Sequence, residues 1–449
     1  MQHKRLLLAV FSAAFFLSAG PLMAQTPPQP KLRLTLQDCL KMASENNAKL
    51  SARDYAIEGS RWRLEEAQAR FWPILEYSHR MAPAPLDALN AAQSFFGGDL
   101  TFFTTSKVGV GIPLYAFGQL TTAQNLAKQG IEAAKVERNK DETKIHSEIK
   151  QLYYGIQLSH ELNNLAQDAV NKINNKLKKE EETHEHSPYD ILKLKVFKSD
   201  LERRIDEANA KEKVARHALK IQLGLPDEQS FELASYSLEP AAKKLEPLEN
   251  YVDKAMEERP DSHLINIGVE SKRLEQQLEK RKLFPRVGLG GFFEFGRTTD
   301  NVQNVRATDS FNNPFNFTRA GVGLELKGQF DFHGSNAKIK RLGNEFYKAQ
   351  IESQLAKRGI GLEVEESYRE VKRLKTSVDR AEERQKMARQ MMFLSKTNLD
   401  IGVGEEQQYT DALQLVLLTR GEYYKTVFDY NIALAKLEEK IGRREGYEE

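Results

Sequence analysis

The sequence predicts a mixed α/β chain that is mostly α-helical, with long antiparallel coiled-coil helices and four β-strands. Three observations predict this fold class. The mean hydropathy is −0.58 and 29% of the residues are charged, as expected for long helices that bury only a narrow apolar seam. A few glycine-containing segments alternate apolar and polar residues with the period of a strand. The same order of segments then occurs twice along the chain.

The first residues have the pattern of a secretory signal peptide over residues 1–24. Lys4 and Arg5 precede an apolar run, Leu6–Leu17, that is too short to cross a bilayer, and Leu22-Met23-Ala24 offers a cleavage site before Gln25. An uncleaved N-terminal membrane anchor is the alternative. After Gln25 no window approaches the roughly 18–20 apolar residues that a membrane helix needs, so we expect an exported chain without a spanning helix.

Composition excludes several classes of function. The 66 Lys and Arg residues nearly balance the 64 Asp and Glu residues, which argues against a nucleic-acid partner, because such a partner requires a concentrated basic surface. The single cysteine, Cys39, cannot form an intrachain disulfide, and we expect it to be a small buried residue of a helix. The sequence has no phosphate-binding loop, zinc-spaced Cys/His cluster or nucleophile elbow. We therefore expect no catalytic residues, no metal and no cofactor, and a protein that is not an enzyme.

The mature chain is predicted to be a tandem duplication, with residues 25–245 as the first repeat and residues 246–449 as the second. One constant offset relates three pairs of segments: Trp72-Pro73 to Phe284-Pro285, Val108–Gly111 to Ala320–Gly323, and Leu36–Ala43 to Leu248–Ala255. The junction falls in a Pro-containing stretch near residues 226–247.

Each repeat is expected to contain a charged helix, a β-hairpin, a long helix, a tip and a returning helix. In the first repeat we place the charged helix at 36–71, the hairpin at 73–115 with its loop at 81–105, the long helix at 121–182 and the tip at 178–190. In the second repeat we place the charged helix at 248–283, the hairpin at 285–327 with its loop at 297–317, and the tip at 400–411.

The predicted strands each have one apolar face. Val287, Leu289 and Phe293 share a face of one strand, and Val322 and Leu324 share a face of its partner. This pattern suits a barrel wall in contact with lipid, and a soluble β-hairpin domain is the alternative. Four strands are too few to close a barrel, since the smallest bacterial barrels use about eight. We therefore expect several identical chains to contribute strands.

The long helices show the spacing of helix packed on helix. Ile145, Ile149, Leu152 and Ile156 recur at steps of three and four residues. A helix of roughly 62 residues over 121–182 would be about 90 Å long, which suits a crossing of the periplasm. The flanking helices have about half that length, so we expect two of them, stacked end to end, to match one long helix.

These residues resemble the TolC-like outer-membrane efflux proteins over nearly the whole mature chain. The segments with this resemblance are Leu34–Asn47, Ile112–Gly118, the looser Phe330–Gly334, and Val416–Gly442. The resemblance implies a homotrimer, with a twelve-stranded outer-membrane β-barrel in lipid above an α-helical periplasmic tunnel. It also implies a Gram-negative outer-membrane duct for efflux or type I secretion that docks on a periplasmic adaptor protein and an inner-membrane transporter. A periplasmic coiled-coil protein with a structural or adhesive role and no pore is the alternative.

The resemblance also implies a gate at the helix tips. Asp190 and Asp411 match the positions where the family has an Asp near the constriction, whereas Gln414 stands where many relatives have a second Asp. Glu405 and Glu406 are the carboxylates that could replace it. Three copies of Asp411 around an axis would form an acidic ring that binds cations, disfavours anions and helps to hold the closed state. A solvated loop without a gating role is the alternative.

The remaining tip residues are expected to contact the adaptor. We expect Gly402 and Gly404 to serve a turn with positive φ, and Val403, His186 and Ser187 to be exposed beside them. His184 and His186 form an isolated pair without further ligands, so we interpret them as solvated tip residues and not as a metal site.

Overall fold

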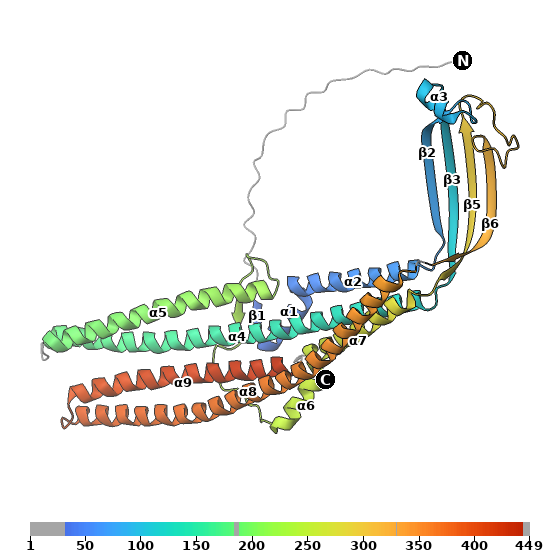
Figure 1. Ribbon diagram of the computed structural model, residues 1–449. Helices are drawn as coiled ribbons and strands as arrows, with labels where there is room; N and C mark the ends of the chain where they lie inside the picture. Colours follow the sequence, from blue (N-terminus) through green and yellow to red (C-terminus); the bar gives the residue numbers. More distant parts are fainter. Residues whose placement is uncertain (1–31, 184–187, 329, 443–449) are drawn as a thin grey trace, which may run out of the picture.

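The computed structural model describes residues 32–183, 188–328 and 330–442, so the predicted signal peptide lies outside the described residues. The elements are β1 (Leu32–Leu34), α1 (Leu36–Asn46), α2 (Ala48–Ala69), β2 (Ile74–Pro85), α3 (Ala91–Gly97), β3 (Leu100–Tyr115), α4 (Gln119–Thr183), α5 (Pro188–Gln222), β4 (Phe231–Leu233), α6 (Leu248–Glu258), α7 (Pro260–Arg281), β5 (Arg286–Thr298), β6 (Phe317–Lys327), α8 (Phe332–Asp400) and α9 (Glu406–Ile441). The helices form an elongated bundle, and the sheet lies at one end of it (Figure 1).

Two long helices form the axis of the molecule. The α4 helix has 65 residues and α8 has 69. Both α2 and α5 pack against α4, and both α7 and α9 pack against α8. In Figure 1, α2 lies along the part of α4 nearer the sheet and α5 along the part farther from it. Two shorter helices thus accompany each long one, as the sequence predicted. None of the described helices combines the length and the apolar character that a membrane span requires.

The charged helices at 36–71 and 248–283 were predicted as single helices, and this is wrong. Asn47 separates α1 from α2, and Arg259 separates α6 from α7; both residues have extended backbones, with ψ of 124° and 126°. The Asn47 side chain accepts a hydrogen bond from the Lys49 amide and donates one to the Gln222 carbonyl. These bonds compensate the break by capping α2 and anchoring it to the end of α5.

The four long strands form one antiparallel sheet in the order β2-β3-β5-β6. The central pair, β3 and β5, joins strands from the two halves of the chain. The strands are longer than predicted, because β3 begins at Leu100 and not near 107, while β2 continues to Pro85. Residues 100–104 are rich in Thr and Phe, which favour strands, and they pair with residues 81–85. The predicted loop at 81–105 is therefore shorter and contains α3.

The sequence analysis missed a second, small sheet. Strands β1 and β4 pair in parallel, with Leu32 opposite Phe231 and Leu34 opposite Leu233. Each strand has only three residues, which is too few for a period of two to be recognised. This sheet joins the start of the described chain to the segment that follows α5.

The four-stranded sheet has two chemically different faces. We call the apolar face the one formed by Leu75, Tyr77, Val108, Val110, Leu289, Phe293, Val322 and Leu324, which the strand register places on one side. We call the polar face the opposite one, whose charged residues are Glu76, Arg80, Lys107, Arg286, Glu294, Arg319, Glu325 and Lys327. No other described element covers the apolar face in one copy of the chain, since Val322 is 80% and Leu324 is 75% exposed.

Two large buried clusters lie among the helices, away from the sheet, and the buried residues of each belong almost wholly to one half of the chain. One cluster joins α1, α4 and the end of α5, and a second joins α6, α8 and α9. Cys39 belongs to the first cluster, is fully buried, and burial raises the pKa of its thiol to about 12. The prediction that it is a small buried helix residue is confirmed.

Candidate functional site

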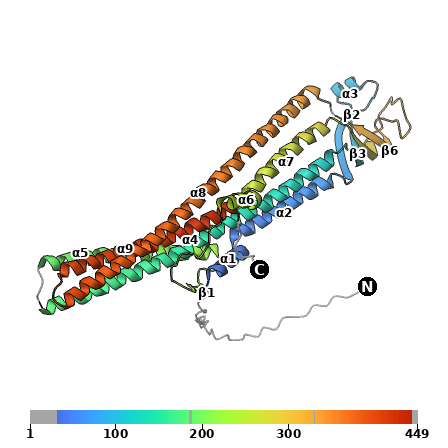
Figure 2. The ribbon, with the colours of Figure 1, turned by 90° about the horizontal axis from the view of Figure 1, so that it is seen from below.

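The two tips that the sequence marks as a gate lie at the same end of the molecule. The α4–α5 tip and the α8–α9 tip are both at the end opposite the sheet in two perpendicular views (Figures 1 and 2). Each tip is shorter than predicted, since α4 continues to Thr183 and α9 begins at Glu406. The tip of the second hairpin is therefore the five-residue turn 401–405.

The α8–α9 turn depends on two glycines. Gly402 has φ of +78°, a left-handed conformation that other residues adopt only with strain. The amides of Val403 and Gly404 both donate to the Asn398 carbonyl, at 3.0 and 2.9 Å. The prediction of positive φ is wrong for Gly404, where a glycine is needed for space instead, since a Cβ there would lie 2.8 Å from the Leu399 amide nitrogen. Both glycines thus serve the geometry of the turn, which presents Val403 with 78% of its surface exposed.

Asp411 lies on an exposed face of α9, one turn beyond the tip. Gln407 donates a hydrogen bond from Nε2 to Asp411 Oδ1 at 2.7 Å. Gln414 follows one turn later and is half-buried, while Glu405 is exposed at the N-cap position of α9. The structure therefore aligns Gln407, Asp411 and Gln414 along one helix face, with Glu405 at its start. Sequence analysis did not select Gln407, although its spacing of four residues from Asp411 predicts this contact.

The other predicted tip residues are only partly described. Asp190 lies in the first turn of α5 and Glu406 is the first residue of α9, but their side chains are outside the described part of the structure. His186 and Ser187, predicted to contact the adaptor, also lie outside the described residues. Their roles remain predictions.

A contact between the two hairpins lies close to the tips. Lys176 of α4 places its Nζ atom 3.5 Å from Oγ1 of Thr410 in α9. This contact joins residues far apart in the sequence, next to Asp411, and no local sequence pattern could have indicated it. It holds the two hairpins together one to two turns above the α8–α9 turn.

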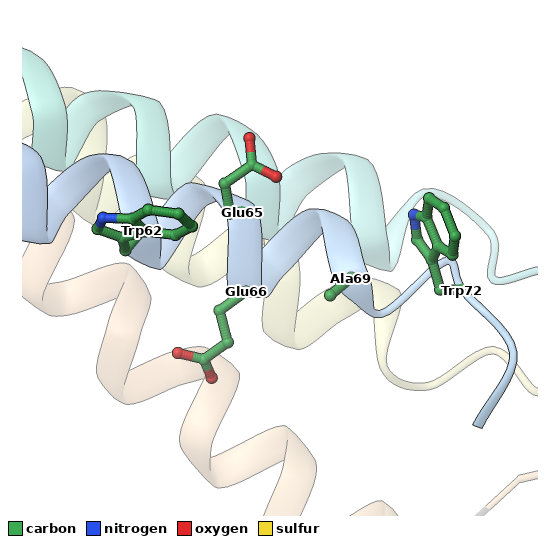
Figure 3. Close-up of a pocket in the computed structure, with 5 residues that line it drawn as sticks. All are labelled: Trp62, Glu65, Glu66, Ala69 and Trp72. Atoms are coloured by element: carbon green, nitrogen blue, oxygen red, sulfur yellow. The ribbon is translucent and has the colours of Figure 1, made fainter. Parts of the chain in front are cut away.

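A further surface with exposed apolar side chains lies at α2, near the sheet. Trp62 and Trp72 are 72% and 71% exposed, and they line a shallow hollow together with Glu65, Glu66 and Ala69. In Figure 3 the Trp62 ring lies along α2, and Trp72 lies past the end of that helix. Large exposed aromatic side chains that line one hollow are typical of surfaces that another molecule covers.

Comparison with known proteins identifies the architecture. No protein-family model and no curated protein sequence matches the chain. Among solved structures it resembles the Neisseria gonorrhoeae MtrE outer membrane channel, solved in an open state, with a TM-score of 0.75 and 15% identity over 91% of this chain and 88% of that one.

Two further solved structures are similar to the chain over most of its length. The Campylobacter jejuni CmeC outer membrane channel has a TM-score of 0.74 and 15% identity, covering 92% of this chain and 87% of its own. The Vibrio cholerae outer membrane protein VceC has a TM-score of 0.72 and 13% identity, covering 91% and 96%. At these identities the likeness concerns architecture, and it extends over both the helices and the sheet. The chain therefore has the fold of the TolC-like outer-membrane channels.

Proposed function

We propose that the protein is the outer-membrane channel of a Gram-negative export system, with its helices extending into the periplasm. The main support is the four-stranded sheet with one uncovered apolar face and one charged face. An antiparallel sheet with alternating faces suits a barrel wall, where one side contacts lipid and the other contacts water. The likeness of the whole chain to outer membrane channels supports the same function.

The functional unit of this proposal is a homotrimer. The sheet has open edges at β2 and β6, each of which pairs with only one neighbour in the described chain. An open edge next to an apolar face is unstable in lipid, because its backbone groups find no hydrogen-bond partner there. If β6 of one copy pairs with β2 of the next, three copies close a twelve-stranded barrel without edges.

Exposed apolar rows on the helices support the same assembly. Along α5 the exposed residues Leu192, Val196, Val214 and Ile221 fall on one side of the helix. Along α8 the exposed residues Tyr347, Ile351, Leu355 and Leu362 recur at spacings of four and seven. A monomer would expose these rows to water, whereas neighbouring copies in a trimer would bury them.

In this proposal, substrates enter at the tips and leave through the barrel, without chemistry by the channel itself. The tips at 184–187 and 401–405 would contact a periplasmic adaptor, which links the channel to an inner-membrane transporter. Efflux and type I secretion both use such an arrangement, as the family resemblance implies.

Purification from membranes tests the proposal. We expect the mature protein in the outer-membrane fraction, as a trimer in detergent, and we expect it to conduct ions in planar lipid bilayers. A water-soluble monomer that does not bind lipid vesicles would contradict the proposal and would favour a periplasmic coiled-coil protein with a structural role.

A further prediction concerns the gate. We expect Asp411→Ala, alone and combined with Glu405→Ala, to raise single-channel conductance. The physical reason is that a ring of three carboxylates near a constriction retains cations and restricts the pore. Glu422→Ala is the matched control: this exposed carboxylate lies on the same helix, about three turns farther from the tip, and pairs with Arg384. Conductance equal to wild type in the Asp411 variants would rule out this gate.

A further inference from the structure

The polar face of the sheet has an ordered distribution of charge. At one level across the sheet, the register places Ser78 beside Lys107, Lys107 beside Glu294, and Glu294 beside Arg319. Two residues closer to the loop end of β2, Arg80 lies on the same face, opposite Thr105. Lys107 and Arg80 are both exposed. This row is the most densely charged level of the polar face.

Two basic side chains of this row each lie over an aromatic ring that covers a glycine of the neighbouring strand. The Phe292 ring lies over Gly321 of the neighbouring strand, where a Cβ would meet the ring at 2.9 Å, and Lys107 Nζ is 5.4 Å from the centre of that ring. The Phe317 ring covers Gly296 in the same way, and the Arg319 guanidinium lies 4.1 Å from its centre. A cation over an aromatic face is attracted to it without losing its charge.

The two basic groups differ in their further contacts. Arg319 also donates to the carbonyls of Phe311 and Asn313, so it positions the loop between β5 and β6. Lys107 has its ring contact with Phe292. Among the described residues, Glu294 forms no ion pair with either neighbour, although it stands between them. The Lys107 ammonium is therefore the group of this row best placed to act on a solute.

Between this row and the helices many positions of the polar face are glycines, while Glu76 and Phe292 add side chains at the first of these levels. Gly109, Gly111, Gly290, Gly321 and Gly323 lie on that face, and no side chain projects from these positions. Over the whole face, five charged residues are basic, namely Arg80, Lys107, Arg286, Arg319 and Lys327, and three are acidic, namely Glu76, Glu294 and Glu325. A lumen lined by this face is positively charged.

Screening determines how far this charge acts. A barrel of twelve tilted strands spaced as in ordinary sheets is about 24 Å across between backbones. Its axis is then about 12 Å from the wall backbone and closer to the side-chain charges. The Debye length is about 10 Å at 0.1 M salt and about 3 Å at 1 M. The wall charge therefore reaches solutes throughout the lumen at 0.1 M and only those at the wall at 1 M.

We propose that the polar face is a charge filter for anionic permeants, with Lys107 as its principal specificity-determining residue and Arg80 in support. This rests on the proposed function, because it requires the sheet to close around a lumen. Within the barrel the filter would favour small molecules or ions with net negative charge over cations of the same size, whereas the acidic ring proposed at Asp411 acts at the opposite end of the channel (Figures 1 and 2).

The test is the reversal potential of purified trimers in planar bilayers under a KCl gradient around 0.1 M. We expect Lys107→Gln to lower the anion-to-cation permeability ratio by about two- to three-fold, since lumen potentials of this kind are on the order of kT. We expect Glu294→Gln, in the same row, to shift the ratio in the opposite direction. Both shifts should shrink strongly in a gradient around 1 M.

Arg297→Gln is the matched control. Arg297 lies on β5 three residues from Glu294, but the register places it on the apolar side, opposite Thr104, so its loss should leave the ratio unchanged. Shifts of opposite sign at Lys107 and Glu294, with none at Arg297, support the filter. Channels that conduct normally but show equal ratios in all four proteins overturn it, whereas failure of every variant and the wild type to form channels would contradict the proposed function instead.

Discussion

Replacing Val322 with arginine is expected to abolish assembly in the outer membrane, whereas the same replacement at the adjacent Gly323 is expected to be tolerated. Val322 is the central residue of β6, lies on the apolar face, and is 80% exposed in one copy of the chain. An arginine at the middle of the lipid-facing surface of a barrel costs about 2–4 kcal/mol, and a trimer contains three copies of it.

The Gly323→Arg variant tests whether the loss of assembly depends on the face of β6 that carries the arginine, and not on the mere presence of an arginine in this strand. It lies on the polar face opposite Gly290, and an added Cβ would meet no atom within 4 Å. An arginine there would project into the lumen and remain hydrated. The measurement is the amount of trimer in the outer-membrane fraction on unheated gels. Equal amounts of trimer for both variants would show that the apolar face does not contact lipid.

Loss of Glu438 is expected to be the most destabilising change in the helical region. Glu438 of α9 binds Lys150 of α4, with 2.6 Å between Nζ and Oε2 and only 9% and 8% of the two side chains exposed. Its other oxygen binds Lys243, in the segment that leads into α6. Glu438→Leu would remove this carboxylate from one buried ammonium group and from a second, partly buried one. Breaking a buried pair in this way costs about 3–5 kcal/mol.

Denaturant unfolding of the detergent-solubilised protein, followed by far-ultraviolet circular dichroism, measures this effect. Lys440→Gln is the control, because Lys440 is 40% exposed and pairs with Glu363 at the surface, where such pairs contribute at most about 1 kcal/mol. Replacing all three groups, as Lys150→Met, Lys243→Met and Glu438→Leu, should recover much of the loss, because the ammonium groups that faced the lost carboxylate are then removed with it. A Glu438→Leu protein as stable as wild type would contradict this prediction.

Local sequence patterns predicted most of the long helices and which strand residues share a face. They predicted less well the residues at which helices and strands begin and end. The heptad-like spacing around Ile145 and Ile149 indicated α4 within a few residues of its observed ends, because a helical seam repeats many times along the chain. The break at Asn47 was missed, since a single residue in an otherwise helical sequence has no periodic signal. Residues 100–104 were read as a loop because their polar Thr residues obscure the alternation, and pairing with β2 decides their strand conformation.

The candidate site was predictable in its location but not in its contacts. The glycines at 402 and 404 located the second tip, and the positive φ of Gly402 and the close packing at Gly404 explain why the turn needs them. The contact between Lys176 and Thr410 could not be inferred, because the two residues belong to different hairpins.

The sequence by itself determined the long helices and the approximate positions of the four long strands, that their sheet has one apolar face, and that one chain has too few strands for a barrel. These properties follow from periodicity and composition, which depend on residues only a few positions apart. The tertiary structure alone decided the partners of Glu438, the rings that cover Gly321 and Gly296, and the pairing of β1 with β4. Each of these unites residues from different elements, and only the packing of those elements brings such side chains together.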